Sequence, residues 1–316
     1  MDIQFPNAAE RIEKIAATLL RDEPAFLTSC AFGPCVAQGS GTGPALLLSD
    51  QAEISLMSNA APSHLEYRMA LLARPGDHVV VRKRHRAFEN YLGSHLALRN
   101  VTFHEVPAGD MRPLAQQLRT SARRVSKLAD IASKNAGLTI KAYLTTGHIW
   151  HLARVIGEKA GCVVHVCGPS PRVAKRANDK LWFARLVQSV IGRRSTPPTR
   201  AAYGPAAAAA LVKRISSDAD HVIVKVPDSA GSAGNLRLDS AELRHQSTAQ
   251  IRQGLLHRLH ATGWHDTYPV LVGVWDKNVI CSPSVQLWLG HLSQGPPRVE
   301  GVFEQRVQTS AATFSG

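Results

Sequence analysis

The chain has 316 residues, of which 44% are hydrophobic and 19% are charged, a composition typical of a folded protein with room for about two domains. It contains no run of eighteen apolar residues, and its N-terminus lacks the apolar and basic regions of a secretory signal, so the cytoplasm is the expected compartment and no membrane is an expected partner. Lys and Arg exceed Asp and Glu by 37 to 24, which favours polyanionic partners such as nucleotides, nucleic acids or phosphorylated and carboxylate substrates.

The first half of the chain alternates between helical and strand patterns. The segment NAAERIEKIAATLL, residues 7–20, predicts an amphipathic helix, with Asn7 and Glu10 at capping-box spacing. Helical patterns also occur at 63–73 and 111–134. Short apolar runs between turn residues predict strands at AFLTSCAF (25–32), ALLLS (45–49), HVVVRK (78–83), VTFHEV (101–106) and GCVVHVCG (161–168). This alternation predicts an α/β fold with an open, mostly parallel sheet over about residues 20–168.

The pattern changes at residue 178. The segment NDKLWFARLVQSVIGRR predicts a helix with Asn178 as N-cap and Gly192 beyond its C-terminus. YGPAAAAALVKRI predicts a helix with Pro205 in its first turn. A further helix is expected at 248–261, and strands are expected at VIVKV (222–226), LRL (236–238), PVLVGVW (269–275), PSVQLWL (283–289) and VEGVFEQRV (299–307).

Lys225 is the one charged residue in the predicted strand VIVKV, whose other residues are β-branched. The loop PDSAGSAGN follows this strand directly. An ammonium in such a strand is partly desolvated unless it reaches solvent or meets an anion. A loop of small residues presents backbone N–H groups that can curl around a phosphate. The segment LRL after the loop predicts a return strand, so this is a β-hairpin, whereas the common glycine-rich phosphate motifs lead into a helix. A hairpin with a solvent-facing lysine is the alternative.

Lys180 lies in the first turn of its predicted helix, where the helix dipole disfavours a cation. An anionic ligand over the same helix start would offset that cost. A lysine without functional meaning at this position remains the alternative.

Several of these segments, in this order, resemble the ATP-grasp ligases, and most resemble the branch with a pre-ATP-grasp domain that includes the pheganomycin-type peptide ligases. The segments are NDKLWFA with Lys180, VIVKVP with Lys225, the loop SAGSAGNLRL, PVLVGVW, SPSVQLWL and PRVEGVFEQ. The likeness is ordered over about 140–316 and weaker before, where it rests on ARPGDHVVVRK and the strand–helix alternation. It implies a pre-ATP-grasp α/β domain at 1–177, a lid subdomain with the hairpin at 178–268, and the start of the ATP-grasp core subdomain at 269–316.

The resemblance also implies roles for particular residues. Lys180 and Lys225 would contact ATP phosphates, the lid loop 228–235 would close over them, and the backbone of VGVW, residues 272–275, would recognise adenine. The positions implied for nucleotide binding are Lys180, Lys225, Ser229, Gly231, Ser232, Ala233, Gly234, Asn235, Val274 and Trp275. The implied reaction is carboxylate–amine ligation through an acyl phosphate, with ATP and Mg²⁺ as cofactors and a carboxylate and an amine as substrates. No catalytic side chain is implied.

Two departures from the family pattern stand out. Many ATP-grasp hinges carry a glutamate where this chain has Gly273. The family binds magnesium through an Asp and a Glu-x-Asn run beyond the hinge, but no glutamate here is followed two positions on by asparagine, and past residue 266 the acidic residues are Asp276, Glu300 and Glu304. Because metal charge normally stabilises phosphoryl transfer, we expect the chain to be a truncated, inactive part of a ligase.

Other functions remain possible from the sequence. The run RKRHR, residues 82–86, and the basic residues at 112–141 could form a nucleic-acid-binding face, although aromatic residues make up only 6% of the chain. A nucleotide-binding protein without catalytic activity is a further alternative. The histidines and the five cysteines form no hydrolase or zinc motif, and Ser170 in CGPSP could line a crevice at the sheet's carboxyl edge.

Overall fold

The computed structural model describes residues 8–22, 32–57, 65–276, 279–290, 295–305, 307–308 and 313–314. By its internal contacts the chain forms two compact units. The parallel-sheet unit comprises Thr18–Glu53 and Ser58–Lys175, and the antiparallel-sheet unit comprises Met1–Ala17, Ile54–Met57 and Arg176–Gly316. None of the helices in these described ranges has the length and apolar character needed to cross a lipid bilayer.

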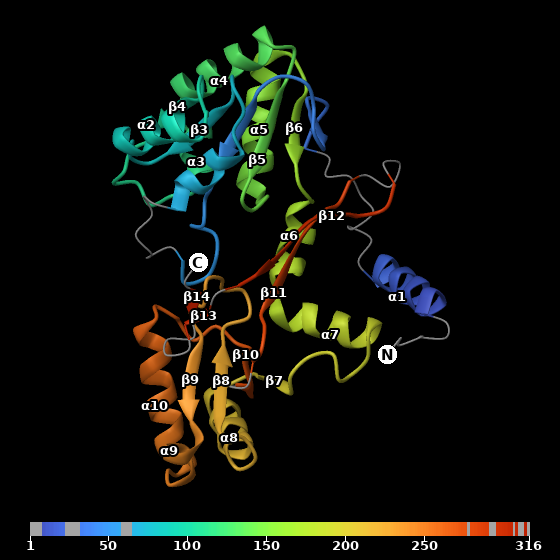
Figure 1. The fold of residues 1–316 in the computed structure, drawn as a ribbon, viewed down its shortest axis with the longest axis vertical. Coiled ribbons are helices and arrows are strands. Elements are labelled where there is room, and N and C mark those ends of the chain that lie inside the picture. The colour runs from blue at the N-terminus through green and yellow to red at the C-terminus, as the bar shows by residue number, and fades with distance from the viewer. Residues whose placement is uncertain are drawn as a thin grey trace. The chain divides into compact units, whose positions relative to one another are not determined.

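The parallel-sheet unit contains six parallel strands in the order β1-β6-β5-β2-β3-β4 (Figure 1). Their bounds are β1 Val36–Gln38, β2 Ala45–Leu48, β3 His78–Val81, β4 Thr102–Glu105, β5 Leu138–Ala142 and β6 Val164–Cys167. From β2 the chain proceeds outward through β3 and β4, and it then crosses to the other side of β2 to form β5 and β6. The direction of winding therefore switches between β2 and β5, so this is a doubly wound α/β sheet.

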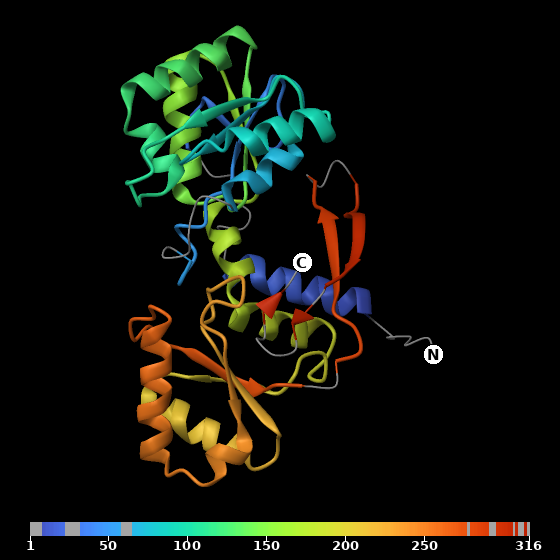
Figure 2. The ribbon, with the colours of Figure 1, turned by 60° about the vertical axis from the view of Figure 1, so that its left-hand side comes forward.

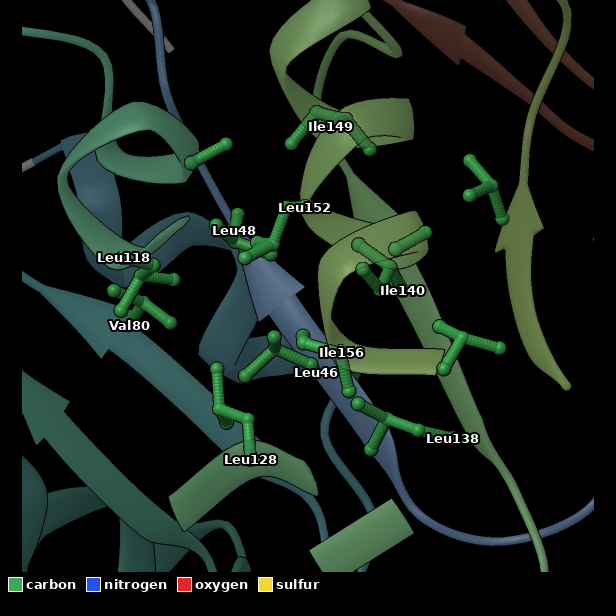
Figure 3. Packing of buried hydrophobic residues seen from close by; sticks show 14 of the residues in the cluster. Leu46, Leu48, Val80, Leu118, Leu128, Leu138, Ile140, Ile149, Leu152 and Ile156 are labelled. Carbon is green, nitrogen blue, oxygen red and sulfur yellow. The ribbon is translucent and has the colours of Figure 1, made fainter. Parts of the chain in front are cut away.

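Helices cover both faces of the six-stranded sheet. They are η2 Leu65–Leu72, α2 Arg86–His95, α3 Leu114–Arg119, α4 Ala122–Lys134 and α5 Gly147–Ala160. Along β2, Leu46 and Leu48 pack with α3, α4 and α5, whereas Leu47 packs with η2 and α2. Figure 3 shows the first of these clusters around Ile140 and Leu152. Because both of its faces are buried, β2 is apolar at every position, which explains why the run ALLL identifies it in the sequence.

The antiparallel-sheet unit is built around four strands in the order β7-β10-β8-β9 (Figure 1). The strands are β7 Thr199–Ala202, β8 His221–Lys225, β9 Leu236–Asp239 and β10 Val270–Val274. Its helices are α6 Pro171–Asn178, which begins in the other unit, α7 Lys180–Val190, α8 Pro205–Ser216, α9 Ser240–Arg244 and α10 Thr248–Ala261. The helices α8 and α10 pack side by side against one face of the sheet (Figures 1 and 2).

Local sequence accounts for the ends of these helices. Pro205 is in the first turn of α8, where its missing N–H costs nothing. Ser247 and Gln250 form a reciprocal capping box at the start of α10. The helix α7 differs from the prediction, because Asp179, and not Asn178, is its N-cap and accepts hydrogen bonds from the N–H groups of Leu181 and Trp182.

The remaining described elements are one helix and two hairpins. The helix α1 spans Ala8–Asp22, and the strands are β11 Pro283–Trp288, β12 Arg298–Glu304, β13 Val307–Gln308 and β14 Thr313–Phe314. The strands β11 and β12 pair with each other alone and form a two-stranded ribbon, coloured red in Figure 2. In this ribbon Val302 and Phe303 are more than half exposed.

Several sequence predictions need correction. The pattern at 111–134 gives two helices, α3 and α4, because the chain turns between Thr120 and Ser121. The pattern at 63–73 gives the 3-10 helix η2. Residues 25–31 of the predicted first strand lie outside the described residues. The strand β10, which follows the predicted lid subdomain in the chain, lies between β7 and β8.

Candidate functional site

Lys225 is the last residue of β8 and lies on the face of the sheet away from α8 and α10. Its neighbours Val224 and Val226 are buried in the core that those helices cover, so alternation places Lys225 on the other face. There it pairs in register with Leu271 of β10. Burial lowers the pKa of the half-buried Lys225 ammonium. Within the described part of the chain, this ammonium has no hydrogen bond and no ion pair.

The loop at residues 226–235, here called the hairpin loop, connects β8 to β9. The two strands pair antiparallel from His221 opposite Asp239 to Val224 opposite Leu236, so the predicted β-hairpin is present. At the loop tip the N–H of Ala233 donates to the carbonyl of Ala230 at 3.0 Å. The two residues between them, Gly231 and Ser232, have positive φ angles of 58° and 64°, as in a type I′ turn.

This backbone conformation leaves donors unused. The N–H groups of Gly231, Ser232 and Gly234 bond to none of the described residues. Gly234 also has a positive φ, of 71°. Successive free N–H groups in a left-handed turn form a concave, positively polarised surface, which is the structure expected of an anion-binding loop.

Lys180 is the first residue of α7, and its side chain reaches the start of the hairpin loop. The Nζ atom donates to the carbonyl oxygens of Val226 and Pro227, both at 3.1 Å, and to the carbonyl and hydroxyl oxygens of Ser229. The backbone N–H of Lys180 also donates to the carbonyl of Pro227. These carbonyl dipoles give the cation at this helix start a partner within the protein, a role that the sequence pattern did not predict.

The structure thus brings the two lysines to the same end of β8. Burial lowers the pKa of Lys180 to about 8, the Asp228 carboxylate opposes that shift, and the Lys225 ammonium adds to it. The two partly desolvated ammonium groups repel each other, and the Asp228 carboxylate offsets part of their charge. Such a pair is stabilised by any anion that contacts both groups.

The other predicted loop residues differ in their roles. Ser229 is buried, and its hydroxyl donates to the carbonyl of Val226 at 2.9 Å, so this side chain stabilises the loop itself. Ala233 and Asn235 use their N–H groups within the loop, Asn235 donating to the carbonyl of Ser232 at 3.1 Å. The side-chain Oδ1 atom of Asn235 is buried and has no hydrogen-bond donor among the described residues.

The predicted hinge residues lie in β10 and directly after it. The N–H of Val274 donates to the carbonyl of Pro198, and the N–H of Trp275 donates to the carbonyl of His221. Because these two donors are used by neighbouring segments, backbone recognition of a base at this position would depend on carbonyl groups. Gly273 lies opposite Thr199, and a β-carbon there would approach the carbonyl oxygen of Pro198 to 2.8 Å. This close approach explains the absence of a larger residue at position 273.

One contributor to the site was missed in the sequence. Ser55 belongs to the antiparallel-sheet unit, and its hydroxyl donates to the Asp228 carboxylate of the hairpin loop at 2.6 Å. Nothing in the sequence links these positions, which are 173 residues apart. Asp228 alone carried a signal, as an acidic residue in an otherwise small and uncharged loop.

The structure weakens the case for a nucleic-acid interface at RKRHR. Arg82 is 5% exposed and is paired with Glu66, and Arg84 is paired with Glu89. These two cations are therefore neutralised within the protein and are poor phosphate ligands.

Ser170 is buried, and its hydroxyl accepts from the N–H of Val173 in α6, so it has a structural role at that helix start. The described residues include no group of three or more His, Cys, Asp or Glu side chains arranged to hold a metal ion.

Parts of the chain are similar to known proteins. Residues 66–158 match the family model of the pre ATP-grasp domain, and no curated protein matches the chain. Similar solved structures include D-alanyl-alanine synthetase A from Vibrio cholerae, with 13% identity and a TM-score of 0.45. That match covers 85% of this chain and 68% of the synthetase chain. The biotin carboxylase domain of 2-oxoglutarate carboxylase from Hydrogenobacter thermophilus has 15% identity and a TM-score of 0.42, with coverages of 85% and 51%. A RimK domain protein, described as ATP-grasp, from Sphaerobacter thermophilus has 14% identity, a TM-score of 0.35 and coverages of 76% and 75%.

Proposed function

We propose that this chain is the nucleotide-binding part of an ATP-grasp carboxylate–amine ligase, because residues 66–158 match the family model of the pre ATP-grasp domain. The observation that carries the proposal is the Lys225 ammonium. It is half-buried, it has no partner among the described residues, and it lies beside a hairpin loop with free N–H groups. A triphosphate supplies the negative charge that this arrangement lacks.

The electrostatics favour a phosphate at this position. An ammonium about 4 Å from a phosphate charge gains roughly 4 kcal/mol at an effective dielectric near 20, before the cost of desolvation. Burial has already removed part of the water from Lys225 and lowered its pKa, so less desolvation remains to be overcome when an anion binds. The N–H groups of Gly231, Ser232 and Gly234 would add hydrogen bonds to phosphate oxygens.

Lys180 contributes in two ways in this proposal. Its bonds to the carbonyls of Val226 and Pro227 hold the start of the hairpin loop against α7. Its charge adds to that of Lys225 at the end of β8, and the two positive charges together favour a bound anion. The backbone around Val274 and Trp275 would contact the base through carbonyl groups.

In the proposed reaction, a carboxylate oxygen of one substrate attacks the γ-phosphorus of ATP, and the bond to the bridging oxygen of ADP breaks. The amine of the second substrate then attacks the acyl carbon, loses a proton and displaces inorganic phosphate, which leaves an amide. The residues described above bind and orient the triphosphate in this scheme. The ligase class normally uses Mg²⁺, but the described residues do not supply a set of carboxylates that fits it.

Titration calorimetry with ATP and with ADP tests the proposal. We expect Lys225→Ala to weaken nucleotide binding about tenfold or more, the loss typical for a charge-assisted contact. Lys159→Ala, which removes an exposed lysine from α5, is the matched control and should bind as the wild type does. Equal affinity of the wild type and Lys225→Ala would remove the basis of the assignment. Steeply salt-dependent DNA binding without competition by ATP would favour the nucleic-acid alternative.

A further inference from the structure

The segment 54–57 lies between β2 and η2 in the chain but belongs to the antiparallel-sheet unit, whereas β2 and η2 belong to the parallel-sheet unit. Within the antiparallel-sheet unit, this 54–57 segment contacts the hairpin loop. The hydroxyl of Ser55 donates to Oδ2 of Asp228 at 2.6 Å, and Ser55 also forms an isolated parallel β-bridge with Ser229.

The next two residues of the segment cover the glycines of the loop tip. A β-carbon at Gly234 would lie 2.4 Å from Cδ1 of Leu56, and one at Gly231 would lie 3.7 Å from Cε of Met57. Leu56 also packs against the core beneath β8, which includes Val226. The two side chains therefore lie over the residues that give the loop its left-handed turns.

Two segments that are distant in the sequence hold the hairpin loop. Lys180 binds the carbonyls of Val226 and Pro227, and Ser55 binds the side chain of Asp228. Without these contacts, a loop of Gly, Ala and Ser would sample many conformations, because such residues lose much backbone entropy when they are fixed. An ordered loop has already met this entropic cost before a ligand arrives.

We infer that Ser55, Leu56 and Met57 are positioning residues that hold the hairpin loop in the turn whose free N–H groups face a phosphate. The inference extends the proposed function, on which the identity of the ligand rests. The ordering of the loop by the 54–57 segment does not depend on that identity. It can therefore be measured on the protein without nucleotide.

The first measurement is amide hydrogen exchange on the full chain without ligand. Ala233 and Asn235 donate the hydrogen bonds of the loop turns, so their exchange reports the order of the loop. We expect Ser55→Ala to exchange roughly fivefold faster at these amides, the factor for the loss of one ordinary hydrogen bond. Ser55→Thr keeps the hydroxyl and should restore the wild-type rate. Ser133→Ala, at an exposed position on α4, is the control.

A second variant tests the packing contribution independently. Leu56→Ala removes the side chain over Gly234 and should also accelerate exchange at Ala233 and Asn235. Wild-type exchange rates in both Ser55→Ala and Leu56→Ala would overturn the inference.

Calorimetry with ATP on the same variants then separates the two proposals. Faster exchange together with weaker binding in Ser55→Ala, and recovery of both in Ser55→Thr, supports the inference. Faster exchange with unchanged affinity would show that loop order does not serve binding, and it would overturn the positioning role. If the wild type binds neither ATP nor ADP, the proposed function is wrong, and the exchange rates alone decide whether the 54–57 segment orders the loop.

Discussion

Gly273 of β10 lies opposite Thr199 of β7, and a β-carbon at Gly273 would come within 2.7 Å of the Thr199 hydroxyl oxygen. The same β-carbon would also crowd the carbonyl oxygen of Pro198. We expect Gly273→Ala to destabilise the antiparallel-sheet unit by about 1–3 kcal/mol, because the two strands must separate. Calorimetric unfolding should show a lower Tm.

Gly254 provides the opposite case for the same substitution. It lies in the interior of α10, is exposed, and has open space around its missing β-carbon. Gly254→Ala should therefore stabilise the same unit by about 0.5–1 kcal/mol through a better helix propensity. A Gly273→Ala variant as stable as the wild type would contradict the packing of β7 against β10.

The ion pair between Arg82 and Glu66 is buried at the end of β3. Arg82 is 5% exposed and Glu66 is 1% exposed, and burial raises the pKa of Glu66 despite the contact with Arg82. We expect Arg82→Met to cost about 3–5 kcal/mol, because it leaves the Glu66 carboxylate buried without its partner. The double variant Arg82→Met with Glu66→Met should lose less than the single variant does. Urea unfolding, monitored by hydrogen exchange of the β2 and β3 amides, measures the stability loss of the single and of the double variant in the parallel-sheet unit.

His78 and His104 form a hydrogen-bonded pair at the edge of the six-stranded sheet, with 3.0 Å between Nδ1 of His78 and Nε2 of His104. Burial lowers the pKa of both histidines, that of His104 to about 4. The charges of Lys127 and Arg84 lower the pKa of His104 further. At His78, the Asp77 carboxylate opposes the effect of burial. An unfolded His titrates near 6.5, so below that pH the unfolded chain binds more protons than the folded one.

Stability from this pair should therefore be present above pH 6.5 and be lost as the pH falls toward 4. Urea unfolding at a series of pH values would show the loss. His104→Gln keeps a hydrogen-bonding side chain without a titrating ring, and its stability should fall less over the same range. His257→Gln, on the exposed surface of α10, should follow the wild type. Identical pH profiles for all three proteins would contradict the prediction.

Nucleotide binding should depend on pH through Lys180. Its pKa is about 8 in the free protein, so the ammonium begins to lose its proton as the pH rises through that value. A bound phosphate favours the charged form, so binding above pH 8 must take up a proton and should weaken as the pH rises. Calorimetry in two buffers with different ionisation enthalpies measures this uptake. Affinity that is constant from pH 7 to pH 9.5 would contradict the role of Lys180.

Much of the fold could be predicted from the sequence, because its signals are local. The apolar run around Leu47 identified a central strand, since both faces of that strand are buried. The helix that begins at Pro205 was found through the proline in its first turn and its alanines, and the helix predicted at 248–261 has those bounds in the structure. The hairpin around Lys225 was found because a return strand follows a loop of small residues.

The remaining features depend on contacts that no local pattern encodes. Asp179 replaced Asn178 as the cap because both residue types can cap a helix, and the end of α6 decided between them. The carbonyl ligands of Lys180 and the bond between Ser55 and Asp228 join positions that only the folded chain brings together. The binding roles of Lys180, Lys225 and the loop residues stay predictions that the experiments above address.

The pairing of β1 with β6 places the first and last strands of the six-stranded sheet side by side, with Val36 opposite Val164. During synthesis, the β1 segment leaves the ribosome about 130 residues before β6, its sheet neighbour among the described strands. At translation rates of roughly 5–20 residues per second, this interval is on the order of 6–25 s. The β1 edge must therefore remain unpaired for seconds in the nascent protein, a period in which a chaperone that recognises extended apolar chain has time to bind.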